Sequence, residues 1–320
     1  MRRFLAKLIV FLGAHLAFLA VSFALYVHRF PPGDSLYAAS SDKLTLLQTQ
    51  ASPRLIFVGG SSMAFGMDSG LVASRCGFHP VNMGLHLGIG LEFMLQEVEP
   101  LVRSGDVVVV SPEYHTFETY YWAEPEYMAR LLECSPSVWR VLSWRQAKAL
   151  LDEGYVHHLG RILRGRWDRS IAGFDQAVNE HTRRQAFNSN GDQISHHPDK
   201  VAQPLGRGAP LRFTFSQSPT VETAIAHLNR FHAVCAGRGA RVFFSHPPYE
   251  RRYFQAYKGA ILQLDDLLRR KLSIPMLDEA QEMTFPSEEI FDLEYHLNLA
   301  GKLKRSELVA LRLRRALQAP

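Results

Sequence analysis

The chain has 320 residues, of which 47% are hydrophobic and 21% are charged. This ordinary balance excludes disordered, collagen-like and low-complexity proteins, and the length fits either two domains or one large α/β domain with insertions. The net charge of +5 is concentrated at the two ends, in residues 2–7 and 302–315, and the rest of the chain is slightly acidic. A nucleic-acid-binding protein usually carries a basic surface on its body, so no nucleic-acid partner is expected here.

An apolar segment follows the basic N-terminus. Residues 8–27 read LIVFLGAHLAFLAVSFALYV, which is 20 residues without a formal charge. A helix of this length can cross about 30 Å of hydrocarbon, whereas the apolar core of a cleaved signal peptide is usually about 7–15 residues long. We therefore expect residues 1–29 to form an uncleaved signal anchor, that is, one N-terminal transmembrane helix, with a cleaved signal peptide as the alternative.

The charges beside this segment predict its orientation. Arg2, Arg3 and Lys7 precede it, while Arg29 follows closely and Asp34 comes soon after. Because positive charges stay preferentially on the cytoplasmic side, residues from about 30 onward are expected outside the cytoplasm. The sequence thus predicts a single-pass protein of a bacterial inner membrane whose main domain is periplasmic or otherwise extracytoplasmic.

Beyond the anchor, the sequence divides into a linker and a domain. Residues 31–34 read Pro-Pro-Gly-Asp, which would end the preceding helix. Residues 30–52 are therefore expected to be a polar linker. Within residues 53–320, short apolar runs alternate with helical patterns, which predicts a three-layer, doubly wound parallel sheet of the α/β class. The expected strands are 55–58, 80–83, 106–110, 240–245 and 274–277, and the expected helices are 91–102, 221–235, 253–272 and 299–317. Residues from about 116 to 215 break this rhythm and are expected to form an insertion of helices and loops.

The cysteine and histidine patterns give no sign of a metal or another cofactor. Cys76, Cys134 and Cys235 lie far apart in the chain and form no CxxC or zinc spacing. The histidine pairs at 157–158 and 196–197 lack a nearby ligand pattern. We therefore expect neither a metal site nor a cofactor.

A Gly-Gly-Ser-Ser turn ends the strand expected at 55–58. Gly59 and Gly60 lead into Ser61 and Ser62. A serine at the end of a buried strand, reached through small residues, can present its hydroxyl above the edge of the sheet, where backbone N–H groups can face a developing oxyanion. Neither serine fits the GxSxG turn of ordinary α/β-hydrolases. Such turns are common structural features, so a second motif is needed before a catalytic function is inferred.

A histidine loop before the last expected helix supplies that second motif. Residues 291–298 read FDLEYHLN, so Asp292 stands four residues before His296 and Glu294 stands two residues before it. A histidine on a loop can act as general base toward a serine while a carboxylate orients its ring. We expect Asp292 to be that carboxylate, with Glu294 as the alternative.

These two motifs, together with an Asn-Met-Gly turn that ends at Gly84, resemble those of the SGNH, or GDSL-like, hydrolase superfamily. The resemblance covers most of residues 54–115 and 240–318. It is closest to the membrane-anchored bacterial branch, which includes the D-alanine transfer protein of teichoic acid modification and acetyltransfer proteins of exopolysaccharide synthesis. The resemblance implies that Ser62 is the nucleophile, that the N–H groups of Ser62 and Gly84 form the oxyanion hole, and that His296 is the catalytic histidine.

One block of the superfamily differs in this chain. The third block normally supplies an asparagine after a strand, but here the strand at 106–110 runs into Ser-Pro-Glu-Tyr-His, residues 111–115. An amide donor of this kind is worth about 3 kcal/mol in the transition state, and it is either absent or supplied from elsewhere. Glu113 and Tyr114 stand where this block would line the site, so they are expected either to contact the substrate or to cap the end of the strand.

Two functions are compatible with this sequence. As an enzyme, the protein would be a serine-dependent acyltransferase or esterase that moves an acyl group, such as acetyl, on a cell-envelope polysaccharide. The resemblance then implies a membrane-bound O-acyltransferase as the partner that delivers the acyl group across the bilayer. As a catalytically weak scaffold, the same domain would dock that membrane enzyme or bind glycan. The retained serine, glycine and histidine favour the enzyme, and the sequence leaves transfer and hydrolysis open.

Overall fold

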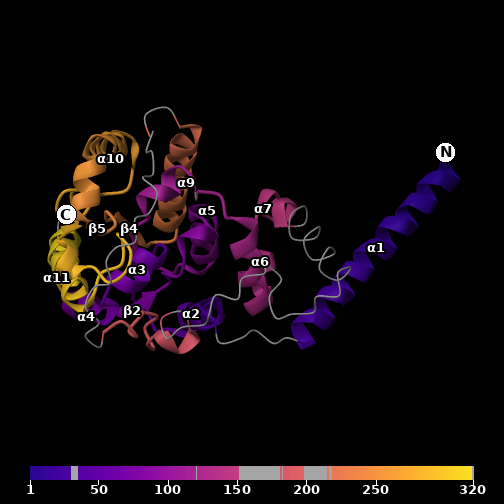
Figure 1. Ribbon diagram of the computed structural model, residues 1–320, viewed down its shortest axis with the longest axis horizontal. Coiled ribbons are helices and arrows are strands. Elements are labelled where there is room, and N and C mark those ends of the chain that lie inside the picture. The colour runs from indigo at the N-terminus through magenta and orange to yellow at the C-terminus, as the bar shows by residue number, and fades with distance from the viewer. Residues whose placement is uncertain are drawn as a thin grey trace.

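The computed structural model of the chain describes residues 1–29, 35–119, 121–150, 181, 183–197, 215 and 218–318. In these residues, four parallel strands form the central sheet in the order β2-β1-β3-β4 (Figure 1). Their bounds are β1 Arg54–Val58, β2 His79–Asn82, β3 Val107–Val110 and β4 Arg241–Phe244. The α/β class and the first four expected strands are thereby confirmed.

The two inner strands are apolar on both faces. Ile56 of β1 and Val108 of β3 belong to one core, whereas Phe57 and Val109 belong to a second core on the other side of the sheet. Successive side chains of a strand point to opposite faces, so a strand that is covered on both sides has to be a continuous apolar run. This is why the runs at 55–58 and 106–110 are recognisable from sequence alone.

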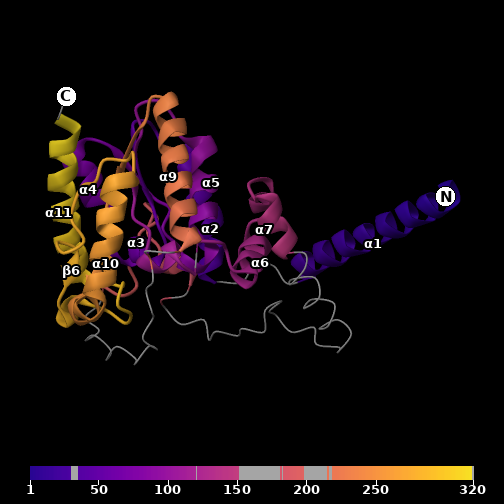
Figure 2. The same cartoon turned by 90° about the horizontal axis from the view of Figure 1, so that it is seen from above.

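Helices cover both faces of the sheet. The bounds of the helices of this part are α3 Ser61–Gly66, α4 Ser69–Cys76, α5 Leu91–Val98, α9 Pro219–Gly237, α10 Arg251–Lys271 and α11 Leu299–Gln318. Helices α4 and α11 lie on one side of the sheet, and α5 and α9 lie on the other (Figure 2). The first pair belongs to the core that contains Phe57, and the second pair belongs to the core that contains Ile56. The four expected helices are confirmed, although α5 ends at Val98 and continues as a 3-10 turn.

Local signals fix the helix that connects β1 to β2. Asp68 precedes α4, and its side chain accepts a hydrogen bond from the N–H of Leu71 at 2.9 Å. Gly77 follows the helix with a φ of 78°, a left-handed conformation that glycine adopts without steric cost. These caps satisfy backbone groups that the ends of any helix leave unpaired.

The expected strand at 274–277 is shortened to a bridge. Phe244 N–H donates to the carbonyl of Pro275 at 2.9 Å, and Leu277 N–H donates to the carbonyl of Phe244 at 2.8 Å, so this segment lies parallel to the end of β4. Pro275 has no N–H to give to a ladder, which limits how far the pairing extends. A separate parallel pair, β5 Tyr249–Glu250 and β6 Thr284–Phe285, lies beyond it.

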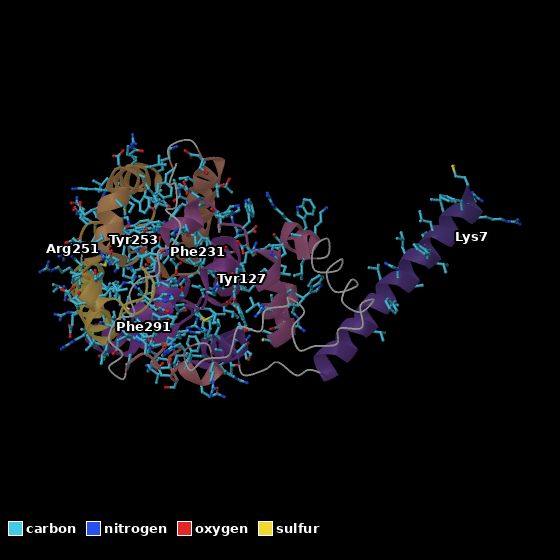
Figure 3. The ribbon with its side chains drawn as sticks, viewed as in Figure 1. Lys7, Tyr127, Phe231, Arg251, Tyr253 and Phe291 are labelled. Atoms are coloured by element: carbon cyan, nitrogen blue, oxygen red, sulfur yellow. The ribbon has the colours of Figure 1, made fainter. Side chains whose placement is uncertain are left out.

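The N-terminal helix α1 Arg2–Arg29 extends away from the α/β body (Figure 1), and Lys7 lies near its far end (Figure 3). Its apolar side chains, for example Ile9 and Phe11, are exposed. Within the described residues, no helix combines the length and the apolar character that crossing a membrane requires.

The expectation of a polar linker over residues 30–52 is wrong for its described second part. A 3-10 turn, η1 Leu36–Ala38, leads into helix α2 Ala39–Thr49. Tyr37 and Leu47 are buried in the core on the Ile56 side of the sheet. The segment is polar in composition because its outer side faces solvent, and its few apolar side chains are enough to attach it to the domain.

The insertion is described in part. Its first portion contains helices α6 Pro125–Cys134 and α7 Trp144–Ala149. Residues 183–197 form a second described portion, which packs against α3 through a hydrogen bond from Gln193 N–H to the carbonyl of Ala64, at 3.0 Å. The histidine pair at 157–158 lies outside the described residues. The insertion therefore contributes to the surroundings of α3, which begins at the Gly-Gly-Ser-Ser turn.

Candidate active site

The candidate site lies where the chain leaves β1 and β3. These strands are neighbours in the sheet but are followed by segments that run to opposite sides, because β1 connects to β2 and β3 connects toward β4. In open parallel sheets, such a reversal of strand order leaves a crevice at the carboxyl ends of the strands, where ligands bind. Ser61 lies three residues after β1 and Glu113 lies three residues after β3.

A serine, a histidine and an aspartate form a continuous hydrogen-bonded chain at this edge. Ser61 Oγ lies 2.8 Å from His296 Nε2, and His296 Nδ1 lies 2.6 Å from Asp292 Oδ1. Ser61 and His296 are 235 positions apart in the chain, so only the folded domain brings them together. The arrangement matches a nucleophile, its general base and the carboxylate that orients the base.

The serine in contact with the histidine is Ser61, whereas the resemblance implied Ser62. Ser62 is completely buried, and its Oγ has no hydrogen-bond partner among the described residues. The reason for the difference is that α3 begins at Ser61. Successive side chains on a helix point about 100° apart, so one of two adjacent serines can face the histidine loop while the other faces inward.

The histidine loop is a tight turn that holds its two functional side chains together. Phe291 N–H donates to the carbonyl of His296 at 2.8 Å, and His296 N–H donates to the carbonyl of Leu293 at 2.9 Å. These bonds fold residues 292–296 back on themselves, so a spacing of four places Asp292 beside the ring. Asp292 thus has the contact expected for it. The alternative, Glu294, uses its backbone carbonyl to accept the N–H of Glu250, and the carboxylate bonded to His296 is that of Asp292.

The surroundings of Asp292 favour its charged form. Burial alone would raise the pKa of this carboxyl, but the hydrogen bond and the charge of His296 outweigh burial and hold the pKa below its ordinary value. The side chain is 40% exposed, so solvent shares in stabilising the charge. An ionised Asp292 accepts the Nδ1–H of His296, which leaves Nε2 as the acceptor for the Ser61 hydroxyl.

An aromatic ring holds the histidine from one side. The ring of Phe65 lies parallel to that of His296, with centroids 4.1 Å apart and an interplanar angle of 6°. Phe291 in turn stacks on Phe65 with centroids 6.0 Å apart. Phe65 belongs to the same helix, α3, as Ser61. One helix therefore supplies both the serine and the surface that fixes the orientation of the imidazole.

The two N–H groups expected to form an oxyanion hole are already hydrogen-bonded. The N–H of Ser62 donates to Glu113 Oε1 at 2.8 Å, and the N–H of Gly84 donates to Asn82 Oδ1 at 2.9 Å. The oxyanion hole expected from Ser62 and Gly84 is therefore not free in this structure. The N–H of Ser61 donates to no acceptor in the portion of the chain that the structure describes. As the first residue of a helix, Ser61 has an N–H for which the helix itself supplies no acceptor.

Glu113 and Tyr114 lie inside the domain instead of lining an open site. Glu113 is completely buried, and its carboxylate caps the turn before α3, because Gly60 N–H donates to its Oε2 at 3.2 Å. Tyr114 is 1% exposed, and burial raises its pKa well above the ordinary value. Of the two roles expected for these residues, the internal one fits the structure.

Three side chains that surround the site were not predicted from the sequence. Arg305 of α11 is completely buried and donates from Nη1 to the carbonyl of Ser62 at 3.0 Å and from Nη2 to Ser111 Oγ at 2.8 Å. His196, from the insertion, places its ring 5.0 Å from that of Phe65, and burial lowers its pKa to about 2. Phe187 packs on a small apolar cluster that is formed by Ala64, Phe65 and Phe291. Nothing local in the sequence marks these residues, because their partners lie on distant segments.

The arrangement suits acyl transfer through a serine. The described residues contain no group of three or more side chains that could hold a metal ion.

Comparison with models of known protein families found no match, and no curated protein is significantly similar in sequence. The geometry of Ser61, His296 and Asp292 is therefore the basis for a functional argument.

Proposed function

We propose that the protein is an extracytoplasmic serine-dependent acyltransferase or esterase. The observation that carries this proposal is the unbroken chain from Ser61 Oγ through His296 to Asp292, with distances of 2.8 Å and 2.6 Å. Both distances lie within the range that proton transfer by a general base requires.

The reaction would proceed in two steps, in which Ser61 is first acylated and then deacylated. Ser61 Oγ attacks the carbonyl carbon of an acyl ester while its proton passes to His296 Nε2, and Asp292 stabilises the resulting imidazolium. The N–H of Ser61, which has no acceptor among the described residues, can donate to the oxyanion. His296 then gives the proton to the departing alcohol, which leaves the acyl group on Ser61. In the second step, water or a sugar hydroxyl loses its proton to His296 and attacks the acyl carbon. The bond from that carbon to Ser61 Oγ then breaks, and His296 returns the proton to Ser61 Oγ, which regenerates both groups.

The location and the substrate class rest on the sequence. The uncharged run 8–27 after three basic residues supports an extracytoplasmic domain. The resemblance to the SGNH superfamily supports an acyl group on a cell-envelope polysaccharide and a membrane-bound O-acyltransferase as partner. A doubly wound, three-layer arrangement fits the sheet order β2-β1-β3-β4 and the helices on both faces.

One observation favours the alternative of a catalytically weak scaffold. The N–H groups of Ser62 and Gly84 already donate to Glu113 and Asn82. They therefore cannot join the N–H of Ser61 in stabilising an oxyanion. The loss of one donor commonly reduces kcat by about 10²–10³-fold. A scaffold that docks a membrane acyltransferase or binds glycan would tolerate this loss.

Covalent labelling of the full-length protein, purified in detergent, distinguishes the two functions. Wild type, Ser61→Ala and Ser62→Ala are treated with a fluorophosphonate probe, and the hydrolysis of p-nitrophenyl acetate is measured alongside. The enzyme proposal expects labelling and turnover in wild type and Ser62→Ala, and loss of both in Ser61→Ala. Ser62→Ala is a matched control because it removes a neighbouring hydroxyl that does not contact His296. A folded wild-type protein that neither labels nor turns over the ester supports the scaffold instead.

A further inference from the structure

We infer that Glu113 is a positioning residue that determines which of the two adjacent serines faces the catalytic histidine. The inference rests on the proposed function and adds a role for a side chain that does not itself contact substrate. It assigns a purpose to the glutamate that stands where the related block of SGNH hydrolases has its asparagine.

The two carboxylate oxygens of Glu113 hold the residues on either side of Ser61. Oε2 accepts the N–H of Gly60 at 3.2 Å, and Oε1 accepts the N–H of Ser62 at 2.8 Å. Two bonds from one rigid, planar carboxylate fix the rotation of the backbone between them. The residue between the two bonds is Ser61, whose hydroxyl contacts His296 rather than Glu113.

This rotation selects the nucleophile. With the N–H groups of Gly60 and Ser62 held inward, Ser61 Oγ lies 2.8 Å from His296, whereas Ser62 Oγ is buried without a partner among the described residues. Arg305 holds the other side of the same turn through the carbonyl of Ser62. A backbone displacement of about 1 Å at a reacting group can cost about 10²-fold in rate.

The sequence of the turn is adapted to the carboxylate. A Cβ at Gly60 would come within 2.5 Å of Glu113 Oε1, and a Cβ at Gly59 would come within 2.6 Å of the carbonyl oxygen of Ser111. A side chain at Gly59 would therefore collide with the backbone of the loop that follows β3, and one at Gly60 would displace the carboxylate of Glu113. The carboxylate and the glycines form one unit that connects the ends of β1 and β3.

A carboxylate is chemically suited to this position and an amide is not. Both N–H groups are donors, and an ionised carboxylate offers two acceptor oxygens. A glutamine offers one oxygen and one NH₂ group, so in either orientation an NH₂ faces a backbone N–H. The unpaired buried donor has to shift or take up water, and the turn moves with it.

Steady-state kinetics of Glu113→Gln test the inference in the full-length protein with p-nitrophenyl acetate. We expect kcat to fall about 10²-fold with KM within about twofold of wild type, and the rate of fluorophosphonate labelling to fall in parallel. Asp278→Asn is the matched control, since this buried carboxylate accepts the N–H of His246 at 2.8 Å and the hydroxyl of Ser245 at 2.5 Å without contacting the serine turn. It should lower the melting temperature and leave kcat within about threefold.

Gly60→Ala provides a second route if Glu113→Gln does not fold. Its new methyl group displaces the same carboxylate while the charge is retained, so the same loss of kcat at constant KM is expected. Gly259→Ala, which meets no atom within 4 Å, controls for the added methyl group. A wild-type serine that does not react would refute the proposed function. A reactive wild type, with either folded variant equally fast, would refute the role of Glu113 and leave the proposed function intact.

Discussion

Two histidine–aspartate pairs lie near the carboxyl edge of the sheet, and they differ in what surrounds them. His296 and Asp292 form a hydrogen bond of 2.6 Å, and His246 and Asp265 form one of 2.9 Å. The second histidine is completely buried, and the side chain of Asp265 is 13% exposed. The side chain of Asp292 is 40% exposed, and the ring of His296 has a serine hydroxyl on its other nitrogen.

Both histidines bond a carboxylate, and of the two only His296 also contacts a serine hydroxyl among the described residues. The hydroxyl of Ser245, the residue before His246, donates to the carboxylate of Asp278 rather than to the imidazole ring. Arg305 connects the two regions, because it donates to the carbonyls of both Ser62 and His246. The His246 pair is therefore bonded within the interior, while the ring of His296 contacts the hydroxyl of Ser61, which is 8% exposed.

Replacing each histidine breaks the comparison most directly. His296→Ala removes the general base, and kcat for an acyl ester should fall by about 10³-fold or more. His246→Asn removes a buried hydrogen bond to Asp265, and we expect a lower melting temperature with kcat within about threefold. Ester hydrolysis and thermal melting of both variants give the answer. Equal losses of kcat would mean that the two pairs do not have separate functions.

Neutralising each aspartate gives a smaller contrast. Asp292→Asn removes the acceptor that holds the His296 tautomer, and kcat should fall by about 10²–10³-fold, less than the value near 10⁴ known for a fully buried triad aspartate. Asp265→Asn should leave kcat nearly unchanged. The variants are compared at one pH with labelling by fluorophosphonate as a second measurement. A full rate in Asp292→Asn would show that the carboxylate does not orient the histidine.

The stacked ring of Phe65 is expected to have a moderate effect. Phe65→Leu removes a parallel ring whose centroid lies 4.1 Å from that of His296, an interaction worth about 0.5–1.5 kcal/mol. We expect kcat to fall about 3–10-fold. Phe291→Leu is the control, because Phe291 stacks on Phe65 and not on the catalytic ring. The proposed support of the imidazole fails if both leucine variants have the same kcat.

Acid sensitivity provides the smallest effect and sharpens the comparison in terms of stability. For Asp265 and for Asp292, burial raises the pKa, but the hydrogen bonds and charges around each carboxyl together outweigh burial, so both have a pKa below the ordinary value. At Asp265 the partners are His246 and Arg269, and at Asp292 the main partner is His296. A carboxyl with a lowered pKa stabilises the folded state above its unfolded pKa of about 3.9, and this stabilisation is lost as the pH falls through the folded value. Melting temperatures between pH 6 and pH 3 should therefore decline less steeply in Asp265→Asn than in wild type. Asp292→Asn should flatten the curve less, because solvent screens its more exposed carboxyl. Parallel curves for all three proteins would contradict this assignment.

Much of the fold follows from patterns that depend on neighbouring residues. The apolar runs at 55–58 and 106–110 are continuous because both faces of those strands are buried, and the helices α9, α10 and α11 have the expected periodicity. The segment 35–49 has the composition of a polar linker, because few of the side chains of its helix are buried, and the sequence therefore predicts a linker there instead of α2. The strand expected at 274–277 was overestimated, because proline shortens its pairing.

Local patterns in the sequence predict the sheet and the histidine loop, and they leave Asp292 and Glu294 as alternatives for the partner of His296. In the folded loop, Asp292 makes this contact. Which of the two serines contacts His296 depends on the tertiary structure. Ser61 and Ser62 are chemically identical neighbours, and the choice between them depends on a backbone rotation that a carboxylate 51 positions beyond Ser62 holds in place. Contacts across that distance depend on how β1 and β3 lie side by side, and only the assembled sheet brings them together.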